Sequence, residues 1–313
     1  MQMGVDKITT VMRNAAELAF LKTIQLGSIR AAARALGQDP SGVSRRITQL
    51  EQRLGAHLVD RSGGKTSVTE QGRLYYERLK VIIEQWDALE AEVSGEVLHP
   101  SGMLRVTASI DFGQEFVTDW LLEFRASYPQ VDFDLVLSGG YLDLSQNVID
   151  VAIRVGRLPD SSLIARKLAS VPRVLVASPK YLERVGVPQT PDDLSDHEFV
   201  FFSSRNRTEK LFLQDDSGKT FEVARSGGVA VNAVRSAVKA VQAGQGIHSG
   251  PLWAFADLID NEEVTVVLPS YKQNAAPLYA VRQPAVIVPA RISEFVEFIA
   301  NKAAGVNGLI SSR

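Results

Sequence analysis

Hydrogen-bonding side chains gather on one face of the segment that follows Asp39-Pro40. In a helix, successive residues are about 100° apart, so residues 40–54 would bring their apolar side chains onto one narrow stripe. That stripe consists of Val43, Ile47, Leu50 and Leu54. The opposite face is polar and contains no acid, with Ser41, Arg45, Thr48, Gln49 and Gln52. Because arginine can donate two hydrogen bonds to O6 and N7 of guanine, and hydroxyl and amide groups suit phosphates and base edges, this face predicts contact with DNA.

Arg45 lies at the centre of the polar face and is the predicted base-reading residue. Ser41 and Ser44, in the first turn, can reach a phosphate or a base, whereas Arg46 lies nearer the edge and suits the phosphate backbone. A solvated amphipathic helix would show the same polar face, so the preceding segments must decide between the two interpretations. The predicted DNA contacts in this region are Arg30, Ser41, Ser44, Arg45, Arg46, Thr48 and Gln49.

Two helix signals precede this segment. Asn14 can cap a helix that Gly27 ends, and Ser28 can cap an alanine-rich helix over Ile29 to Leu36. The acid followed by proline at Asp39-Pro40 marks the start of a third helix, because proline suits the first helical position. Two helices joined by so tight a turn are typical of a helix-turn-helix, which favours DNA binding.

A short β-hairpin is predicted after the third helix. Residues 58–60 and 66–68 are strand-like and flank a turn with two glycines and a basic residue at each end. This hairpin would be the wing of a winged helix, and Arg61 and Lys65 would contact phosphates or the minor groove. Basic loops are usually only solvated, so this prediction depends on the neighbouring helix.

Charge is distributed unevenly along the chain. Ten basic and five acidic residues between Ser28 and Lys80 give a net charge of +5, and because the whole chain carries −2, the remainder carries −7. A basic segment joined to a mildly acidic one is typical of a nucleic-acid-binding module fused to a domain of another kind. Chance clustering is the alternative.

Composition excludes several classes of protein. With 45% hydrophobic residues the chain can bury a substantial core, and 313 residues are enough for two or three domains. Cysteine is absent and the four histidines are scattered, so we expect no disulfide, metal site or cofactor. No nucleotide-binding loop or nucleophile elbow is present, so no catalytic residues are predicted. With no membrane-spanning run and no signal peptide, a cytoplasmic protein without membrane attachment is expected.

A long helix is predicted from Thr69 to the break at His99-Pro100-Ser101-Gly102. About 29 residues of helix would extend roughly 44 Å, which suits a seam between two subunits better than packing inside a small domain. A helix lying across its own C-terminal domain is the alternative. The apolar residues fall at heptad spacing, at Tyr75, Leu79, Ile82, Trp86, Leu89 and Val93, and the last five are the predicted dimerisation residues.

The remaining residues alternate between strand-like and helix-like segments, which predicts an α/β sheet architecture. The first set has strands at 104–108, 133–137 and 150–154, with helices at 115–128 and 142–147. The second set has strands at 173–177, 199–202 and 228–231 and a helix at 232–243. Two α/β lobes are therefore expected, followed by a strand at 278–281 and a helix at 290–300.

Candidate ligand-binding residues stand where strands end and helices begin, which is where α/β lobes bind ligands. We expect a small-molecule effector between the lobes, with an anionic group held near Ser109. Serine and asparagine are also ordinary helix caps, and a lone histidine is more often structural, so these residues have a second interpretation. The predicted effector-binding residues are Ser109, Ser203, Ser204, Asn232 and His248.

Motifs that follow one another without a gap from about Glu17 to Gly72 resemble the N-terminal signature of LysR-type transcriptional regulators. They are Ser28-Ile29-Arg30-Ala31-Ala32, Val43-Ser44-Arg45-Arg46-Ile47, Leu50-Glu51, Leu54-Gly55, Leu58-Val59-Asp60-Arg61 and Thr69-Glu70-Gln71-Gly72. Two features depart from the family pattern. Asp39-Pro40-Ser41 replaces a Ser-Gln-Pro-like opening of the recognition helix, and the residues before Asn14 form an extension that we expect to be a disordered tail.

The resemblance implies a winged helix-turn-helix in residues 1–68, a linker helix and hinge in 69–100 and a two-lobed effector domain like a periplasmic binding protein in 101–313. Lobe I would comprise about 101–172 and 273–303, and lobe II about 173–272, with two strands crossing between them. The partners implied are operator or promoter DNA, a small effector and a second copy of the chain, with pairing of dimers into tetramers. A solute-binding component of a transport or sensing system, without DNA binding, is the alternative.

Overall fold

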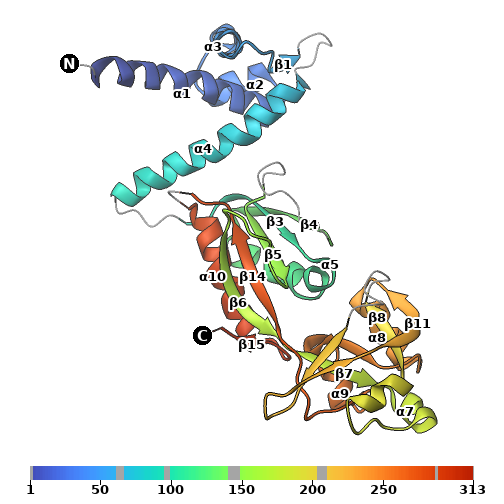
Figure 1. Ribbon diagram of the computed structural model, residues 1–313. Helices are drawn as coiled ribbons and strands as arrows, with labels where there is room; N and C mark the ends of the chain where they lie inside the picture. Colours follow the sequence, from blue (N-terminus) through green and yellow to red (C-terminus); the bar gives the residue numbers. More distant parts are fainter. Residues whose placement is uncertain are drawn as a thin grey trace. The chain divides into compact units, whose positions relative to one another are not determined.

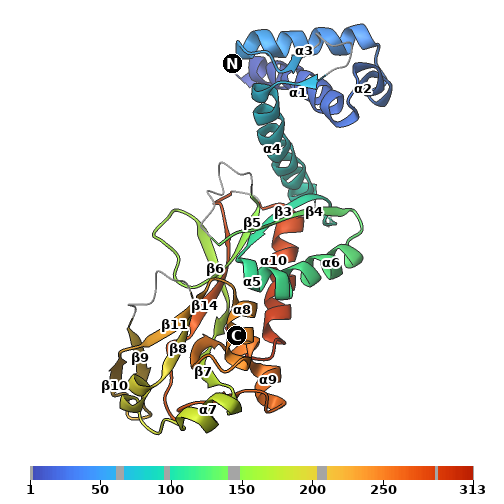
Figure 2. The same ribbon diagram turned by 90° about the vertical axis from the view of Figure 1, so that its right-hand side faces the viewer.

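The computed structural model describes residues 3–60, 67–94, 99–139, 149–202, 210–285 and 288–312. The chain divides into two compact units, Met1–Leu98 and His99–Arg313, which are described separately below (Figures 1 and 2).

The first unit is a helix-turn-helix followed by a hairpin and a long helix, as expected. Ser28 accepts a hydrogen bond from the amide of Ala31 at 3.4 Å, and Asp39 accepts one from the amide of Gly42 at 2.7 Å. The two caps begin the second and third helices where the sequence predicts. The elements are α1 (Met3–Leu26), α2 (Ile29–Ala35), α3 (Pro40–Leu54), β1 (Val59–Asp60), β2 (Ser67–Val68) and α4 (Glu70–Ser94).

Three local predictions in this unit are wrong: the Asn14 cap, the disordered tail before it, and the burial of Leu54. Helix α1 begins at Met3, so Asn14 lies inside the helix and does not cap it, and the described residues before Asn14 are helical. A capping side chain sets a boundary only where the backbone leaves the helical conformation, and no proline or glycine between Val5 and Asn14 forces it to do so. Leu54 is 40% exposed, because the domain core ends at Leu50 on that face of α3.

Helix α4 is built into the core of the first unit at its N-terminal end. Leu79 is buried there, and Tyr75 and Ile83 pack against the same cluster. Gly72 lies so close to the preceding segment that an added Cβ would be 2.0 Å from the carbonyl oxygen of Leu58. Only glycine allows the first turn of α4 to approach the backbone beside the hairpin this closely.

Lobe I of the second unit is a six-stranded mixed sheet in the order β15-β6-β14-β5-β3-β4. Strands β3, β4 and β5 run parallel, whereas β14 is antiparallel to both β5 and β6. The strands are β3 (Gly102–Ala108), β4 (Val131–Leu137), β5 (Val151–Val155), β6 (Ile164–Val171), β14 (Ala276–Arg282) and β15 (Ile310–Ser311).

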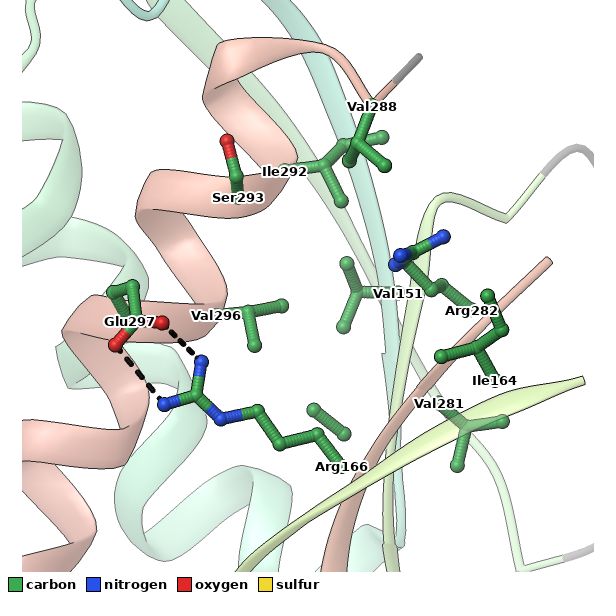
Figure 3. Close-up of a pocket in the computed structure, with 11 residues that line it drawn as sticks. Val151, Ile164, Arg166, Val281, Arg282, Val288, Ile292, Ser293, Val296 and Glu297 are labelled. Carbon is green, nitrogen blue, oxygen red and sulfur yellow. Dashed lines mark hydrogen bonds and ion pairs between the residues drawn. The ribbon is translucent and has the colours of Figure 1, made fainter. Parts of the chain in front are cut away.

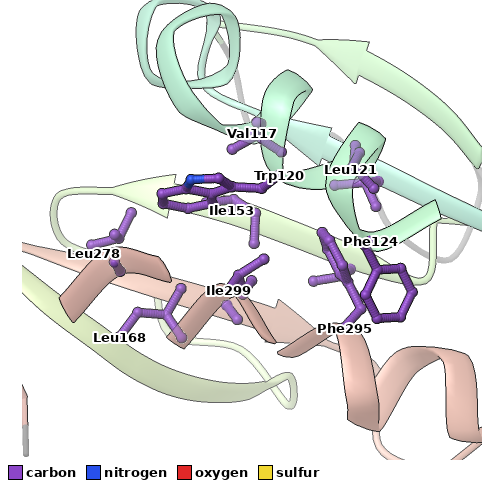
Figure 4. Close-up of a cluster of buried hydrophobic side chains, with 14 of the residues drawn as sticks. Val117, Trp120, Leu121, Phe124, Ile153, Leu168, Leu278, Phe295 and Ile299 are labelled. Carbon is purple, nitrogen blue, oxygen red and sulfur yellow. The ribbon is translucent and has the colours of Figure 1, made fainter. Parts of the chain in front are cut away.

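Helices α6 (Thr118–Ser127) and α10 (Ala290–Ala304) cover this sheet and bury its largest core. Figure 4 shows Trp120 and Phe124 of α6 together with Phe295 of α10 and side chains from the strands. The rings of Phe124 and Phe295 are 5.3 Å apart and nearly perpendicular. The helix that leads into α6 begins as α5 (Ile110–Phe112) and passes through a π-helical turn, η1 (Gly113–Val117).

Lobe II is built around two small sheets. Strand β7 is central to the order β12-β7-β13, and β8 pairs in parallel with β11. Strands β9 and β10 form an antiparallel hairpin. The elements are β7 (Arg173–Ala177), α7 (Pro179–Val185), η2 (Asp192–Asp196), β8 (Glu198–Phe202), β9 (Leu211–Gln214), β10 (Thr220–Val223), β11 (Ser226–Val231), α8 (Val234–Gln242), β12 (His248–Pro251), η4 (Leu252–Ala254), α9 (Ala256–Asp260) and β13 (Thr265–Val266).

Two segments connect the lobes, as the resemblance implies: β6 leads through Pro172 into β7, and the chain returns from β13 to β14. The lobes also touch through Trp253 of η4, whose ring centroid lies 6.1 Å from that of Phe112 and 5.4 Å from that of Phe116. The two-lobed α/β architecture is therefore confirmed. The sequence patterns missed β6, β9, β10, β12, β13 and β15.

Candidate nucleic-acid interface and effector pocket

Helix α3 presents the polar face that its sequence predicts. Val43, Ile47 and Leu50 are buried, whereas Arg45 and Gln49 are exposed on the other side of the helix. The helix starts at a capped N-terminus and ends at Gly55, which has a φ of 66°. Packing of the apolar face therefore fixes the helix, and the face that carries Arg45 is exposed to solvent, where it can enter a DNA groove.

Other predicted DNA contacts differ in their surroundings. Arg30 and Ser41 are exposed, and Ser44 and Thr48 are half-buried. The Ser41 hydroxyl donates to the Asp39 carboxylate, and the Arg46 guanidinium donates to the side-chain carbonyl of Gln38. Arg46 is thus anchored to the turn before α3. Arg61 and Lys65 lie outside the described residues.

Two acidic residues to which the sequence analysis assigned no role of their own hold helix α3 in place. Glu51 of α3 accepts hydrogen bonds from the amides of Leu58 and Val59, at 2.8 and 3.1 Å, which ties the helix to the hairpin. Glu17 of α1, nearly buried, pairs with Arg53 at the end of α3. Glu17 and Arg53 are 36 residues apart, and Leu58 and Val59 lie outside the helix that contains Glu51, so helical periodicity could not reveal these contacts.

The exposed apolar face of α4 does not follow the predicted heptad stripe throughout. Leu79 is only 8% exposed because it packs inside its own domain, so its assignment to dimerisation is wrong. Ile82 and Trp86 are 58% and 45% exposed, and Leu74, which the stripe omitted, is 60% exposed. The side chains of Leu89 and Val93 lie outside the described residues.

A pocket of 420 Å³ opens on lobe II beside the two connections to lobe I. Arg173 stands at the start of β7, immediately after one connection, and Gln273 and Asn274 belong to the other. The lining residues are Arg173, Val200, Phe201, Phe202, Lys210, Leu211, Phe212, Arg225, His248, Ser249, Gln273 and Asn274.

The pocket is cationic, since the described residues that line it include Arg173, Lys210 and Arg225 and no acid. Lys210 is paired with Glu222 at 2.5 Å on the exposed side. The Arg225 guanidinium lies over the Phe201 ring, 5.3 Å from its centroid. Arg225 therefore holds its positive charge against an aromatic side chain of the pocket wall.

His248 contributes a neutral ring to this pocket. Burial lowers the pKa of its imidazole to about 4, although a hydrogen bond to Val200 acts in the opposite direction. Nδ1 lies 2.8 Å from the Val200 carbonyl oxygen, and because a carbonyl only accepts, Nδ1 carries the hydrogen. In the neutral ring Nε2 is then an acceptor.

Hydrogen bonds join the pocket wall to the return connection. Arg173 donates to the carbonyl oxygen and the hydroxyl of Ser249, at 2.6 and 3.2 Å. The Ser249 hydroxyl donates in turn to the side-chain carbonyl of Gln273 at 2.6 Å. A ligand that contacts Arg173 would therefore act directly on both segments between the lobes.

The structure brings only one of the described effector-binding candidates into this pocket, namely His248. Ser203 and Ser204 lie outside the described residues, although they follow Phe202 of the lining directly. Ser109 precedes α5 without a side-chain capping bond and does not line the pocket.

The interpretation of Asn232 as a helix cap is wrong, because Ala233 is the residue that precedes α8. The Asp111 carboxylate of lobe I instead accepts a hydrogen bond from the Val234 amide at 2.8 Å. Glu115 of η1 and Arg235 of α8 add an ion pair of 2.7 Å beside it. An acid from the other lobe thus meets the first amide of α8, where a local cap was expected.

Among the residues described, no His, Asp or Glu side chains gather in a group of three or more that could hold a metal ion. Within the same ranges, no helix combines the length and apolar character needed to cross a membrane.

A helix-turn-helix unit and a two-lobed unit with a cationic pocket define a DNA-binding regulator that responds to a small molecule. Comparison with known families identifies the class: the profile described as "Bacterial regulatory helix-turn-helix protein, lysR family" matches residues 18–73, and "LysR substrate binding domain" matches residues 99–304. The chain belongs to the LysR family. It is a DNA-binding transcriptional regulator with an effector-binding domain, and not an enzyme.

Relatives of known role agree with this assignment along most of the chain. An HTH-type transcriptional repressor of Pseudomonas aeruginosa is 32% identical over 296 residues, 94% of this chain and 92% of the relative. The transcriptional activator AaeR of Escherichia coli is 31% identical over 261 residues, 83% of this chain and 84% of the relative. The alternative of a solute-binding component without DNA binding is therefore set aside.

Solved structures of full-length family members share the fold. The virulence activator AphB of Vibrio cholerae has a TM-score of 0.58 at 25% identity, covering 91% of this chain and 98% of that chain. CrgA of Neisseria meningitidis has a TM-score of 0.57 at 26% identity, covering 92% and 97%.

Proposed function

We propose that this regulator binds operator DNA as a homodimer in the cytoplasm and responds to a small anionic effector bound in the pocket of lobe II. The observation that carries the effector proposal is the presence of two arginines and a lysine in the pocket lining, where the described residues include no acid. A carboxylate or phosphate gains affinity in such a pocket, because hydrogen bonds between arginine and an anion are short and strong.

Arg45 is the proposed base-reading residue, with Ser41, Ser44 and Gln49 around it. Exposure at the centre of a capped and packed helix is what the major groove requires of such a side chain. Arg30, Arg46 and Thr48 are proposed as phosphate contacts, and Arg61 and Lys65 of the hairpin turn as contacts with phosphates or the minor groove. Domain limits of 1–68, 69–100 and 101–313 accompany this proposal.

The first prediction concerns base reading. Arg45→Ala should weaken binding to the operator by ~1–3 kcal/mol and relax the preference at one base pair, because a bidentate contact to guanine is lost. The ligands are operator duplexes selected from a randomised pool. Their affinities are measured at one fixed salt concentration. Arg30→Ala is the matched control. It should weaken binding to all DNA sequences alike, and the slope of log K against log salt concentration should fall by about the value of one phosphate contact. An equal loss on selected and random DNA for Arg45→Ala would show that it does not read a base.

The pocket suits a small anion. Arg173 and Arg225 can bind a carboxylate through charged hydrogen bonds. Ser109, Ser203, Ser204 and Asn232 remain part of the proposal as effector-binding residues.

The second prediction tests the pocket. A screen of small carboxylates should yield a compound that raises the melting temperature by mass action, since it binds the folded chain. Arg225→Met should lower the affinity for that compound at least ~10-fold, because a charged hydrogen bond is lost. Arg184→Met, which removes an arginine of lobe II outside the pocket, should not. A compound that binds Arg225→Met as tightly as the original chain would place the effector elsewhere.

Dimerisation is proposed through α4, with Ile82 and Trp86 on its exposed apolar face and Leu89 and Val93 at the next positions of the heptad pattern. Helix-turn-helix proteins gain affinity by binding two half-sites through a two-fold dimer. Pairing of dimers into tetramers through the effector domains is a further part of the proposal.

A further inference from the structure

A second, apolar cavity lies in lobe I, between α10 and the strands β5, β6 and β14. Its volume is 230 Å³. Figure 3 shows Val151 of the sheet facing Ile292 and Val296 of α10 across the space. The charged side chains of the lining are Arg166, Arg282 and Glu297.

This cavity shares no lining residue with the cationic pocket of lobe II, as far as the described residues extend. Arg282 is the last residue of β14, whereas the return connection enters the strand at Ala276. Six steps along a strand at about 3.3 Å each place the two ends roughly 20 Å apart. The cavity therefore lies at the end of lobe I that faces away from the connections to lobe II.

The charges at the cavity leave one cation available among the described lining residues. Arg166 and Glu297 form a two-bond ion pair with each other, one bond being 3.0 Å long, and so neutralise one another (Figure 3). Arg282 is half-buried, and among the described residues its guanidinium donates only to the carbonyl oxygen of its neighbour Gln283, at 3.0 Å. A partly desolvated guanidinium favours a carboxylate, which it can bind through two parallel hydrogen bonds.

From this arrangement we infer that lobe I has a second ligand site, which takes a small monocarboxylate with an aromatic or branched apolar body. The apolar body lies between Val151, Ile292 and Val296, and the carboxylate pairs with Arg282. The cavity has the space of about eight water molecules at ~30 Å³ each, which limits the ligand to a compact acid. An apolar wall with a few placed polar groups is the usual character of small-molecule sites.

The site lies beside the helix that contacts the first strand of the effector domain. Arg291, beside Ile292 on α10, donates to the carbonyl oxygen of Met103 at 2.8 Å, near the start of β3. Movement of α10 against the sheet on ligand binding is therefore transmitted to the first strand of the domain. This inference does not depend on the effector proposed for lobe II.

Phenylacetate, with its neutral amide as a comparison, provides the probe. Calorimetric titration of the full chain should show saturable binding of phenylacetate, and phenylacetamide should bind at least ~10-fold more weakly because it lacks the charge that Arg282 pairs with. Arg282→Met should reduce phenylacetate affinity by a similar factor. Val296→Phe should abolish binding by filling the cavity.

Two control variants test whether phenylacetate binds at this cavity. Arg125→Met removes an exposed arginine of the same lobe outside the cavity and should leave binding unchanged. Arg225→Met, in lobe II, should also leave it unchanged, and each variant is first checked for an unaltered melting temperature. Loss of binding in Arg225→Met but not in Arg282→Met would overturn the inference, as would equal affinity for the acid and the amide. The inference would also be overturned if phenylacetate at about 10 mM did not bind the folded chain.

Discussion

Replacing Ile82 and Trp86 with aspartate should separate the DNA-binding units into monomers and abolish tight operator binding. The two side chains are 58% and 45% exposed in the single chain, whereas Leu79 and Ile83 of the same helix pack in the domain core. Losing one large apolar side chain from a packed seam costs ~2–5 kcal/mol, and the buried charge adds to this loss. Operator affinity should fall by about 10²–10⁴, because the two half-sites are no longer bound by linked modules.

Light scattering of residues 1–98 and of the full chain measures the assembly. Arg73→Asp provides the matched control, because Arg73 is exposed on the opposite side of α4 from Ile82, about 180° around the helix. The control should remain dimeric. The full-length double variant can remain associated through its effector domains while losing operator affinity. If the short double variant remains a dimer, the chains pair through another surface.

The free energy of unfolding of the second unit should fall by about 3 kcal/mol as the pH is lowered from 7.5 to 4. His248 is the cause, because its pKa is lowered from 6.5 to about 4 in the folded chain. Between these two values the unfolded chain binds a proton that the folded chain does not bind, so acid favours unfolding. The contribution is therefore fully present above pH 6.5 and is lost as the pH approaches 4.

Denaturant unfolding at a series of pH values measures how steeply the free energy of unfolding changes with pH. His248→Gln should remove most of this slope, and His57→Gln, which changes an exposed histidine of the first unit, should not. A smaller slope will remain, because burial also lowers the pKa of His197, against the opposing charge of Asp196. An unchanged slope in His248→Gln would assign the acid sensitivity to other groups.

Helix α3, which carries the proposed base-reading residue, could be predicted from sequence because its signals are local. The Asp39-Pro40 start and the stripe of Val43, Ile47 and Leu50 all lie within one short segment, and the structure confirms each of them. Leu79 was misassigned for the same reason, since apolar spacing shows that a residue is buried but not whether its own domain or a partner buries it.

The pocket of lobe II was beyond sequence reasoning. Arg173, Arg225 and Gln273 follow one another at intervals of about fifty residues and belong to no motif, so only the fold brings them together. Asn232 was interpreted as a cap because the residue preceding a helix usually satisfies its first amides. Here Asp111 from the other lobe does so, and a contact between residues 123 positions apart leaves no pattern in the sequence.

The close approach of Gly72 to the Leu58 carbonyl, with Tyr75 and Leu79 in the same core, makes the start of α4 inseparable from the helix-turn-helix. This decides how such a regulator can be recombined with a foreign sensor. A graft that cuts the chain before Gly72 would open the hydrophobic core of the DNA-binding unit and expose it to water. A graft that cuts at His99 keeps all of α4, so the transplanted piece carries both its operator specificity and the surface that we expect to pair it, and each half retains its own core.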